Sequence, residues 1–298
     1  PVPTMWASSV VDHSQGLRKD GTSVLAERSD PSNALGPPDS GVSGPPVKFF
    51  SLGFGGWIIL GFPYPIANGP GDDALVVETT WGTYPLESAD VRVSQDGTTW
   101  VYAGTVDNVN KQGKVPLPDD LAWVSYVKIE DTTNPDIHGS DADGYDLDAV
   151  GAYYTVTGTV EKTLSEYEGY LGDVITVTLN VEVATGLTMT VEDVLPSCLG
   201  YIPGTFMVGC MSVTPTVSDG VISTTLEGGV YVVKFDVQVV QVEATVVTDT
   251  NRVYLKYDTL IVDEDSADIT TYPYCGFHKL AFLESTEDGD DILSLIHI

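Results

Sequence analysis

Apolar and polar residues alternate with a period of two along many short stretches of this chain, which is typical of β-strands with one buried face. The alternation is clean at residues 123–130, 173–182, 229–238 and 251–256. Gly, Pro, Asn and Asp separate these stretches, and apolar patterns with the helical period are scarce. Each stretch is expected to bury one face and expose the other. The sequence therefore predicts an all-β protein.

The strands fall into two series. Within the first, segments 89–94 and 99–103 flank Asp96-Gly97, a pair that readily adopts the positive φ angles of a tight hairpin turn. The first series closes at about residue 155, and a second begins without a long linker. Several long strands in residues 156–275 suit an immunoglobulin-like β-sandwich. Residues 276–298 form a tail with an apolar end at 292–298, which is expected either to pack on its own sandwich or to add a strand between subunits.

Charge limits the partners of this chain. It carries 13 Lys and Arg against 43 Asp and Glu, a formal net charge of −30. Nucleic acid is excluded as a partner, because phosphate binding needs clustered basic residues. No apolar run approaches the roughly 18 residues that span a bilayer, so no membrane span is expected. The chain starts at Pro1 rather than Met, which fits removal of an export signal, and we expect an extracellular protein.

Acidic residues concentrate in one short stretch around Gly144. Asp141, Asp143, Asp146 and Asp148 follow one another at near-alternating spacing. Closely spaced carboxylates around a glycine turn supply several of the roughly six to eight oxygen ligands that Ca²⁺ takes. The twelve-residue loop of an EF-hand, with its terminal glutamate, is absent. The stretch predicts a structural calcium site; the alternative is a solvated acidic turn that leads into a strand.

Common catalytic signatures are missing. The four histidines are far apart in the sequence, and there is no nucleophile elbow, phosphate-binding loop or Cys-x-x-Cys pair. A pair of carboxylates acting as a glycosidase is the remaining enzymatic alternative. Cys198 and Cys210 are close enough in sequence to predict a disulfide, which leaves Cys275 either buried or available for a bridge between molecules.

The first half resembles a family of surface modules. The motifs lie at residues 33–39, 51–56, 68–73 with 76–78, 91–100 and 143–150. They follow the order seen in discoidin-like jelly-roll modules of prokaryotic cell-surface proteins. The resemblance implies a galactose-binding-like jelly-roll β-sandwich over residues 1–155, stabilised by calcium. It also implies that the acidic stretch closes against the loop 68–73, with Asp72, Asp73 or Glu78 as further ligands.

The second half resembles repeat modules of archaeal and bacterial surface proteins. The matching positions are Lys162, Gly172-Asp173, Asp193-Val-Leu-Pro196 and Asn251-Arg-Val253, although Ala184-Thr-Gly186 replaces the usual Asn-x-Gly. Some relatives join a lysine of the first strand to an asparagine of the last strand through an isopeptide bond promoted by a buried acid. The resemblance places Lys162 and Asn251 in these positions, with Asp193 or Glu192 as the acid. The alternative is an ordinary exposed lysine and a turn-forming asparagine.

Together these features predict a non-catalytic extracellular structural protein. It is expected to assemble with copies of itself into a cell-surface layer, sheath or filament stabilised by Ca²⁺. The alternative is a carbohydrate-binding surface adhesin, with Trp81 as the aromatic residue best placed to contact a glycan.

Overall fold

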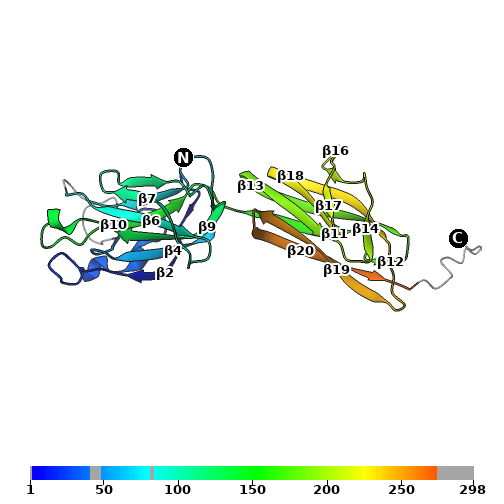
Figure 1. Ribbon diagram of the computed structural model, residues 1–298, viewed down its shortest axis with the longest axis horizontal. Coiled ribbons are helices and arrows are strands. Elements are labelled where there is room, and N and C mark those ends of the chain that lie inside the picture. The colour runs from blue at the N-terminus through cyan, green and yellow to red at the C-terminus, as the bar shows by residue number, and fades with distance from the viewer. Residues whose placement is uncertain (1, 41–47, 81–83, 274–298) are drawn as a thin grey trace, which may run out of the picture. The chain divides into compact units, whose positions relative to one another are not determined.

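The computed structural model describes residues 2–40, 48–80 and 84–273. The chain divides into two units, Pro1–Thr157 and Gly158–Ile298. The described residues form strands and three short 3₁₀ helices (Figure 1). The predicted all-β class is confirmed. No helix among the described residues is both long and apolar enough to cross a membrane.

Unit 1 is a sandwich of two five-stranded antiparallel sheets. The first contains β1 (Met5–Trp6), β10 (Asp146–Ala152), β5 (Ala74–Glu78) and β8 (Gln112–Val115) in that order, with β3 (Phe50–Ser51) also on β10. The second has the order β2 (Ser9–Ser14), β4 (Trp57–Ala67), β9 (Trp123–Asp131), β6 (Ser88–Ser94) and β7 (Val101–Asp107). Inward residues of both sheets form one buried core. This is the jelly-roll sandwich that the first half predicts.

The predicted hairpin turn joins β6 and β7. Asp96 Oδ1 accepts the backbone N–H groups of Thr98 and Thr99, each at 2.7 Å, and Gly97 has a φ of +75°. A residue with a Cβ is strained at that angle, which explains the glycine.

Unit 2 is built around one long ribbon of two strands. Its elements are β11 (Gly158–Leu164), β12 (Glu168–Gly169), β13 (Val174–Val194), β14 (Leu199–Tyr201), β15 (Met207–Val208), β16 (Met211–Ser212), β17 (Thr216–Ser218), β18 (Val221–Val239), β19 (Val247–Tyr257) and β20 (Leu260–Thr271). β13 pairs with β18 along both its halves. On its other edge, the first half of β13 pairs with β11 and the second half with β19.

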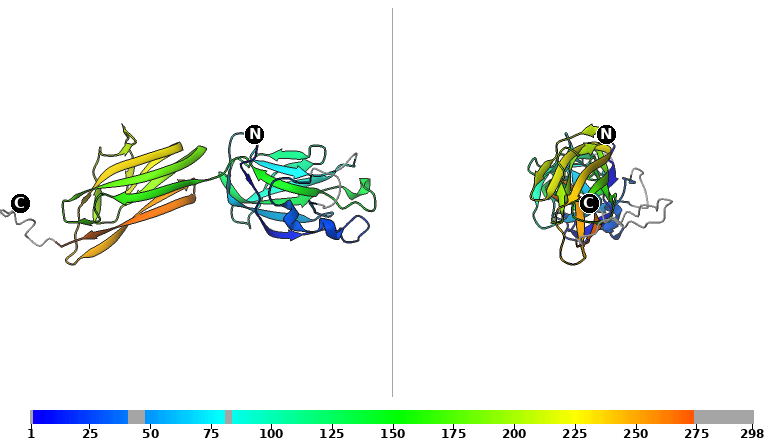
Figure 2. Two further views of the ribbon diagram at one scale, coloured as in Figure 1. Left: turned by 180° about the vertical axis from the view of Figure 1, so that it is seen from behind. Right: turned by 90° about the vertical axis from the view of Figure 1, so that its right-hand side faces the viewer.

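The β13–β18 ribbon folds over at its middle, where its register is interrupted between Val183 and Thr188. Gly186 has a φ of +86°, and a Cβ on Gly228 would meet the Thr185 Cα at 2.7 Å. The two strands therefore approach so closely at the bend that only glycine fits. Figures 1 and 2 show the green and yellow strands of the ribbon above the orange hairpin of β19 and β20. The fold brings the inward faces of the two halves of β13 toward each other.

Candidate functional site: a buried lysine, aspartate and asparagine

Three strands of unit 2 each place one polar residue at an inward position. Lys162 lies between Val160 and Leu164 on β11, Asp193 follows Val191 on β13, and Asn251 precedes Val253 on β19. The side chains of Lys162 and Asp193 are 0% and 1% exposed, and Asn251 is 0% exposed. Because alternation places these side chains among apolar neighbours, each must find a polar partner inside the core.

The three side chains meet. Lys162 Nζ donates a hydrogen bond to Asp193 Oδ2. The amide of Asn251 lies beside the Asp193 carboxyl and acts to lower its pKa. However, neither Oδ1 nor Nδ2 of Asn251, nor Oδ1 of Asp193, has a hydrogen bond of normal geometry among the described residues. Buried polar atoms are nearly always paired, so three unpaired atoms at one point need an explanation.

Burial favours the uncharged forms of Lys162 and Asp193 over the ion pair. Desolvation lowers the pKa of Lys162, opposed by the charge of Asp193. Desolvation likewise raises the pKa of Asp193, opposed by Lys162 and by the Asn251 amide. Both shifts favour a free amine on Lys162 and a protonated carboxyl on Asp193, because an apolar core penalises separated charges. A free amine is a nucleophile, and a protonated carboxyl is a general acid.

This arrangement has the groups needed for one specific reaction. In it, Lys162 Nζ would attack the side-chain carbonyl carbon of Asn251, and the Asp193 carboxyl would protonate the departing amide nitrogen. The amine and the primary amide would become one secondary amide and one molecule of ammonia, and Asp193 would recover its proton from the Lys162 nitrogen. No outside reagent is required.

The structure brings together the residues that the resemblance placed in these roles. It also distinguishes between the two candidate acids, because Glu192 points away from the core and accepts a hydrogen bond from Lys256 Nζ. Asp193 is therefore the acid beside Lys162. The alternative of an exposed lysine and a turn-forming asparagine is wrong, since both residues are buried within strands.

The predicted calcium ligands, in contrast, do not all lie at one place in unit 1. Antiparallel pairing puts Glu78 opposite Leu147, and the Asp73 carbonyl accepts the N–H of Tyr153. Five residue steps separate Asp73 from Glu78 along the strand, so Asp73 lies about 17 Å from the Glu78 end. The other predicted ligands make separate contacts: Asp72 and Asp141 are exposed, Asp73 accepts the N–H groups of Gly69 and Leu117, and Asp148 accepts those of Asp39 and Ser40.

Where the structure describes the chain, no three acidic, His or Cys side chains surround a common point as metal ligands would. The set drawn from the sequence therefore does not fit one calcium ion. Its error lies in the strand register, which places the loop 68–73 at the far end of β5 from Asp146.

Three of the predicted ligands, Glu78, Asp143 and Asp146, do gather with Glu87 at the Glu78 end of unit 1, and we call this group the acidic chamber. It consists of the buried residues Glu78, Glu87, Asp143 and Asp146. Thr80 Oγ1 donates to Glu78 and lies 3.3 Å from Glu87 Oε2, while Asp143 Oδ2 pairs with Arg28 Nη1 at 3.1 Å. Glu78 Oε2 and Asp146 Oδ1 lack hydrogen-bond partners among the described residues.

Burial and crowding in the acidic chamber favour the protonated form of two of its acids. Burial, with the charge of Glu78 added, raises the pKa of Glu87 to about 8. Burial and the neighbouring carboxylates also raise the pKa of Asp146 well above its ordinary value. Glu87 and Arg28 were not predicted from the sequence, because both are far in sequence from the acidic stretch 141–148 that they approach in the fold.

The predicted disulfide is not formed, and Cys198 and Cys210 are both free thiols. Cys198 is buried ahead of β14, and burial together with Asp249 raises its pKa to about 12. Cys210 is exposed in the turn between β15 and β16, on the outer edge of β18. The β15–β16 hairpin carries Cys210 away from Cys198, so the two cysteines are close in sequence but do not pair. Cys275, Trp81 and the segment 292–298 lie outside the described residues.

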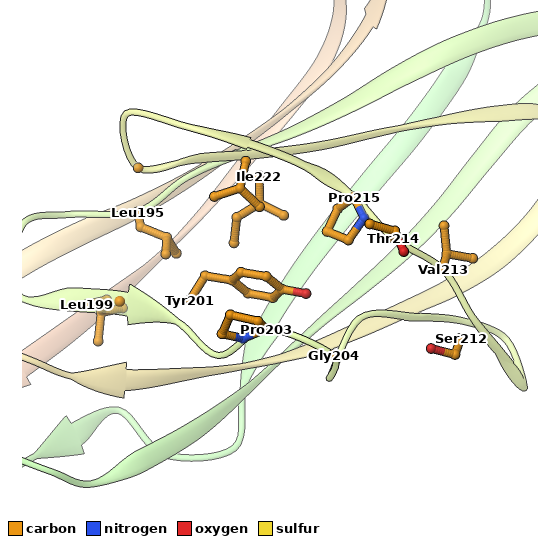
Figure 3. A pocket seen from close by; sticks show the side chains of 13 residues that line it. Leu195, Leu199, Tyr201, Pro203, Gly204, Ser212, Val213, Thr214, Pro215 and Ile222 are labelled. Atoms are coloured by element: carbon orange, nitrogen blue, oxygen red, sulfur yellow. The ribbon is translucent and has the colours of Figure 1, made fainter.

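An apolar pocket of about 530 Å³ opens elsewhere in unit 2 (Figure 3). Leu195, Ile222 and Pro203 surround the ring of Tyr201, and Val213 and Pro215 continue the lining. None of its lining residues is acidic, basic or a histidine. The pocket thus lacks a pair of groups able to act as general acid and base on a bound molecule.

No protein-family model and no curated protein sequence matches this chain. Among solved structures, the N-terminal domain of the Streptococcus gordonii adhesin Sgo0707 is similar at 10% identity and a TM-score of 0.38 over 73% of this chain. The aligned part spans 61% of that adhesin chain. An allantoicase matches at 8% identity and a TM-score of 0.33, over 78% of this chain and 89% of its own. The S. aureus collagen adhesin matches at 11% identity and a TM-score of 0.25, over 74% and 88%. Similarity this low transfers no function.

Proposed function

We propose that this protein is a non-catalytic extracellular structural protein whose second unit is locked by an amide bond between Lys162 and Asn251. The observation that carries the proposal is the burial of Lys162, Asp193 and Asn251 side by side, with the asparagine amide unpaired. The chain itself is the substrate of this single reaction, and the apolar pocket of unit 2 offers no second set of acid and base groups.

The position of the bond suits a unit that resists unfolding. Among the described strands of the unit, Lys162 is on the first and Asn251 on the last but one, so the bond closes residues 162–251 into a loop. A pull applied at Gly158 and Thr271 would pass from β11 through the bond to β19. Residues inside the loop would bear no tension. A structural protein exposed to shear or proteases gains from such a shield, because cleavage and extension both require unfolding.

Intact-mass measurement tests the bond. The purified chain is expected to weigh less than its sequence mass by one ammonia, and a peptide linking Lys162 to Asn251 should appear after proteolysis. Lys162→Arg and Asp193→Ala should keep the full mass. Glu192→Gln removes the neighbouring outward-facing carboxylate and should still lose ammonia. A parent chain at full sequence mass would overturn the proposal.

We also propose that copies of this chain assemble at the cell surface into a layer, sheath or filament. A charge of −30 per copy opposes contact between copies, so divalent cations such as Ca²⁺ would promote assembly by neutralising carboxylates. Electron microscopy of the purified chain with calcium should show polymers that loosen in EGTA. Monodisperse particles under both conditions would refute assembly while leaving the internal bond untouched.

A further inference from the structure

Strands β11 and β20 lie side by side without a backbone ladder between them. β11 pairs along its whole length with β13 on one edge. On the other edge, Asp263 Oδ2 accepts the backbone N–H of Val160 at 2.8 Å, and Asp265 Oδ2 accepts that of Lys162 at 2.6 Å. In Figures 1 and 2 the orange hairpin that ends in β20 runs along the green β11. Two side chains thus stand in for a strand partner.

The match between the two strands is regular. The donors are two residues apart on β11, and the acceptors are two residues apart on β20, which is the side-chain repeat of a strand. Asp263 and Asp265 share the inward-facing positions of β20 with Ala267 and Ile269, whereas Glu264 faces outward. The two carboxylates therefore fix how far β11 is shifted along β20.

We propose that Asp265, helped by Asp263, is a positioning residue that holds Lys162 in register with Asn251 for bond formation; this rests on the proposed function. β20 pairs with β19 so that Asp265 is opposite Val253 and Ala267 is opposite Asn251. Asp265 is thus bound through its backbone to the strand that carries the electrophile. Through its side chain it holds the backbone of the nucleophile. One residue links the two reacting strands before any covalent bond exists.

Asp265 also acts on the charge of the nucleophile. The charged groups facing Lys162 are Asp193 from β13 and Asp265 from β20, and each raises the lysine pKa against the lowering effect of burial. Asp265 therefore aligns the amine but also favours its protonated, unreactive form. The two effects separate on substitution, because Asn keeps an acceptor oxygen without the charge, whereas Ala removes both.

The test follows both folding and bond formation in the full chain. Protein recovered from inclusion bodies in denaturant, and confirmed by mass to lack the bond, is refolded at a series of pH values. The calorimetric transition of unit 2 reports its folding, and intact mass reports ammonia loss with time. Asp265→Ala is expected to fold but to form the bond on the order of tenfold more slowly. Asp265→Asn should react at a rate near that of the parent, with its rate–pH profile shifted to lower pH. Glu264→Gln, which removes an outward-facing charge from the same strand, should leave the rate and the profile unchanged.

Each outcome has a distinct meaning. Ammonia loss from Asp265→Ala at the parent rate overturns the positioning role while the bond itself stands. If Asp265→Ala fails to fold, Asp265→Asn decides, and an unshifted pH profile in that variant overturns the proposal. A parent chain that folds without losing ammonia refutes the proposed function, and the positioning role with it.

Discussion

The amide bond should stabilise unit 2 by an amount that follows from its place in the chain. Asn251→Ala removes the electrophile but keeps the Lys162–Asp193 pair. The bond closes a loop of 251 − 162 = 89 residues, for which the chain-entropy relation gives about 4.6 kcal/mol at 25 °C. For a unit of this size the melting entropy is about 240 cal/mol/K, so the variant should melt roughly 15–20 °C lower.

Differential scanning calorimetry measures this effect, with the transition of unit 1 as an internal reference. Asn251→Ala also removes packing, so a matched background is needed. In Lys162→Met the bond cannot form, and adding Asn251→Ala there reports the packing loss alone. The difference between the two Asn251→Ala effects is the contribution of the bond. A difference below about 1 kcal/mol, in a parent whose mass shows the bond, would refute the loop-entropy reasoning.

Three further results are expected. The pKa of Glu87 is about 8 in the folded chain against an ordinary 4.5, so the neutral acid stabilises unit 1 and this stability is lost as pH rises from about 4.5 to 8, by at most about 5 kcal/mol; unit 1 should melt lower at pH 9 than at pH 6, and a Glu87→Gln variant that keeps the full pH dependence would contradict the assignment. Gly228→Ala places a Cβ 2.7 Å from the Thr185 Cα, so we expect unit 2 to lose about 2 kcal/mol or more by denaturant unfolding, and an unchanged midpoint would show that the bend opens freely. Stretching of unit 2 in a force spectrometer should release only residues 158–162 and 251–271, roughly 90 Å of extended chain, whereas Lys162→Met should release the whole unit.

Alternation made part of the site readable from the sequence. Lys162 occupies a core position between Val160 and Leu164, and Asn251 precedes Val253 and Leu255 at the same period. A polar residue at such a position is expected to be buried and therefore to need a partner. Alternation alone does not show that these two residues meet Asp193, because the meeting depends on the fold of β13 at residues 184–187. The resemblance, not the pattern, placed the three residues together, and it left Asp193 and Glu192 as alternatives.

The errors in unit 1 and in the cysteines have a common physical cause. Carboxylates that are close in sequence, such as Asp146 and Asp148, make contacts with different loops once strand register is set. Residues that are far apart, such as Arg28 and Asp143, become partners. The acidic composition predicts that carboxylates will come close to one another, but strand pairing decides which of them do so. The same reasoning applies to Cys198 and Cys210, whose short separation spans a hairpin that leads outward.

Burial makes the proposed reaction a consequence of folding rather than a competitor to it. In the unfolded chain, water keeps Lys162 protonated and Asp193 ionised, so neither the nucleophile nor the acid exists in its reactive form. Only a folded core removes that water, and the contacts of Asp263 and Asp265 with β11 fix the lysine strand against β20. A misfolded or slipped unit would therefore stay unbonded and open to proteases. The bond would then form only in correctly folded copies. By closing residues 162–251 into a loop, it would also oppose their later unfolding.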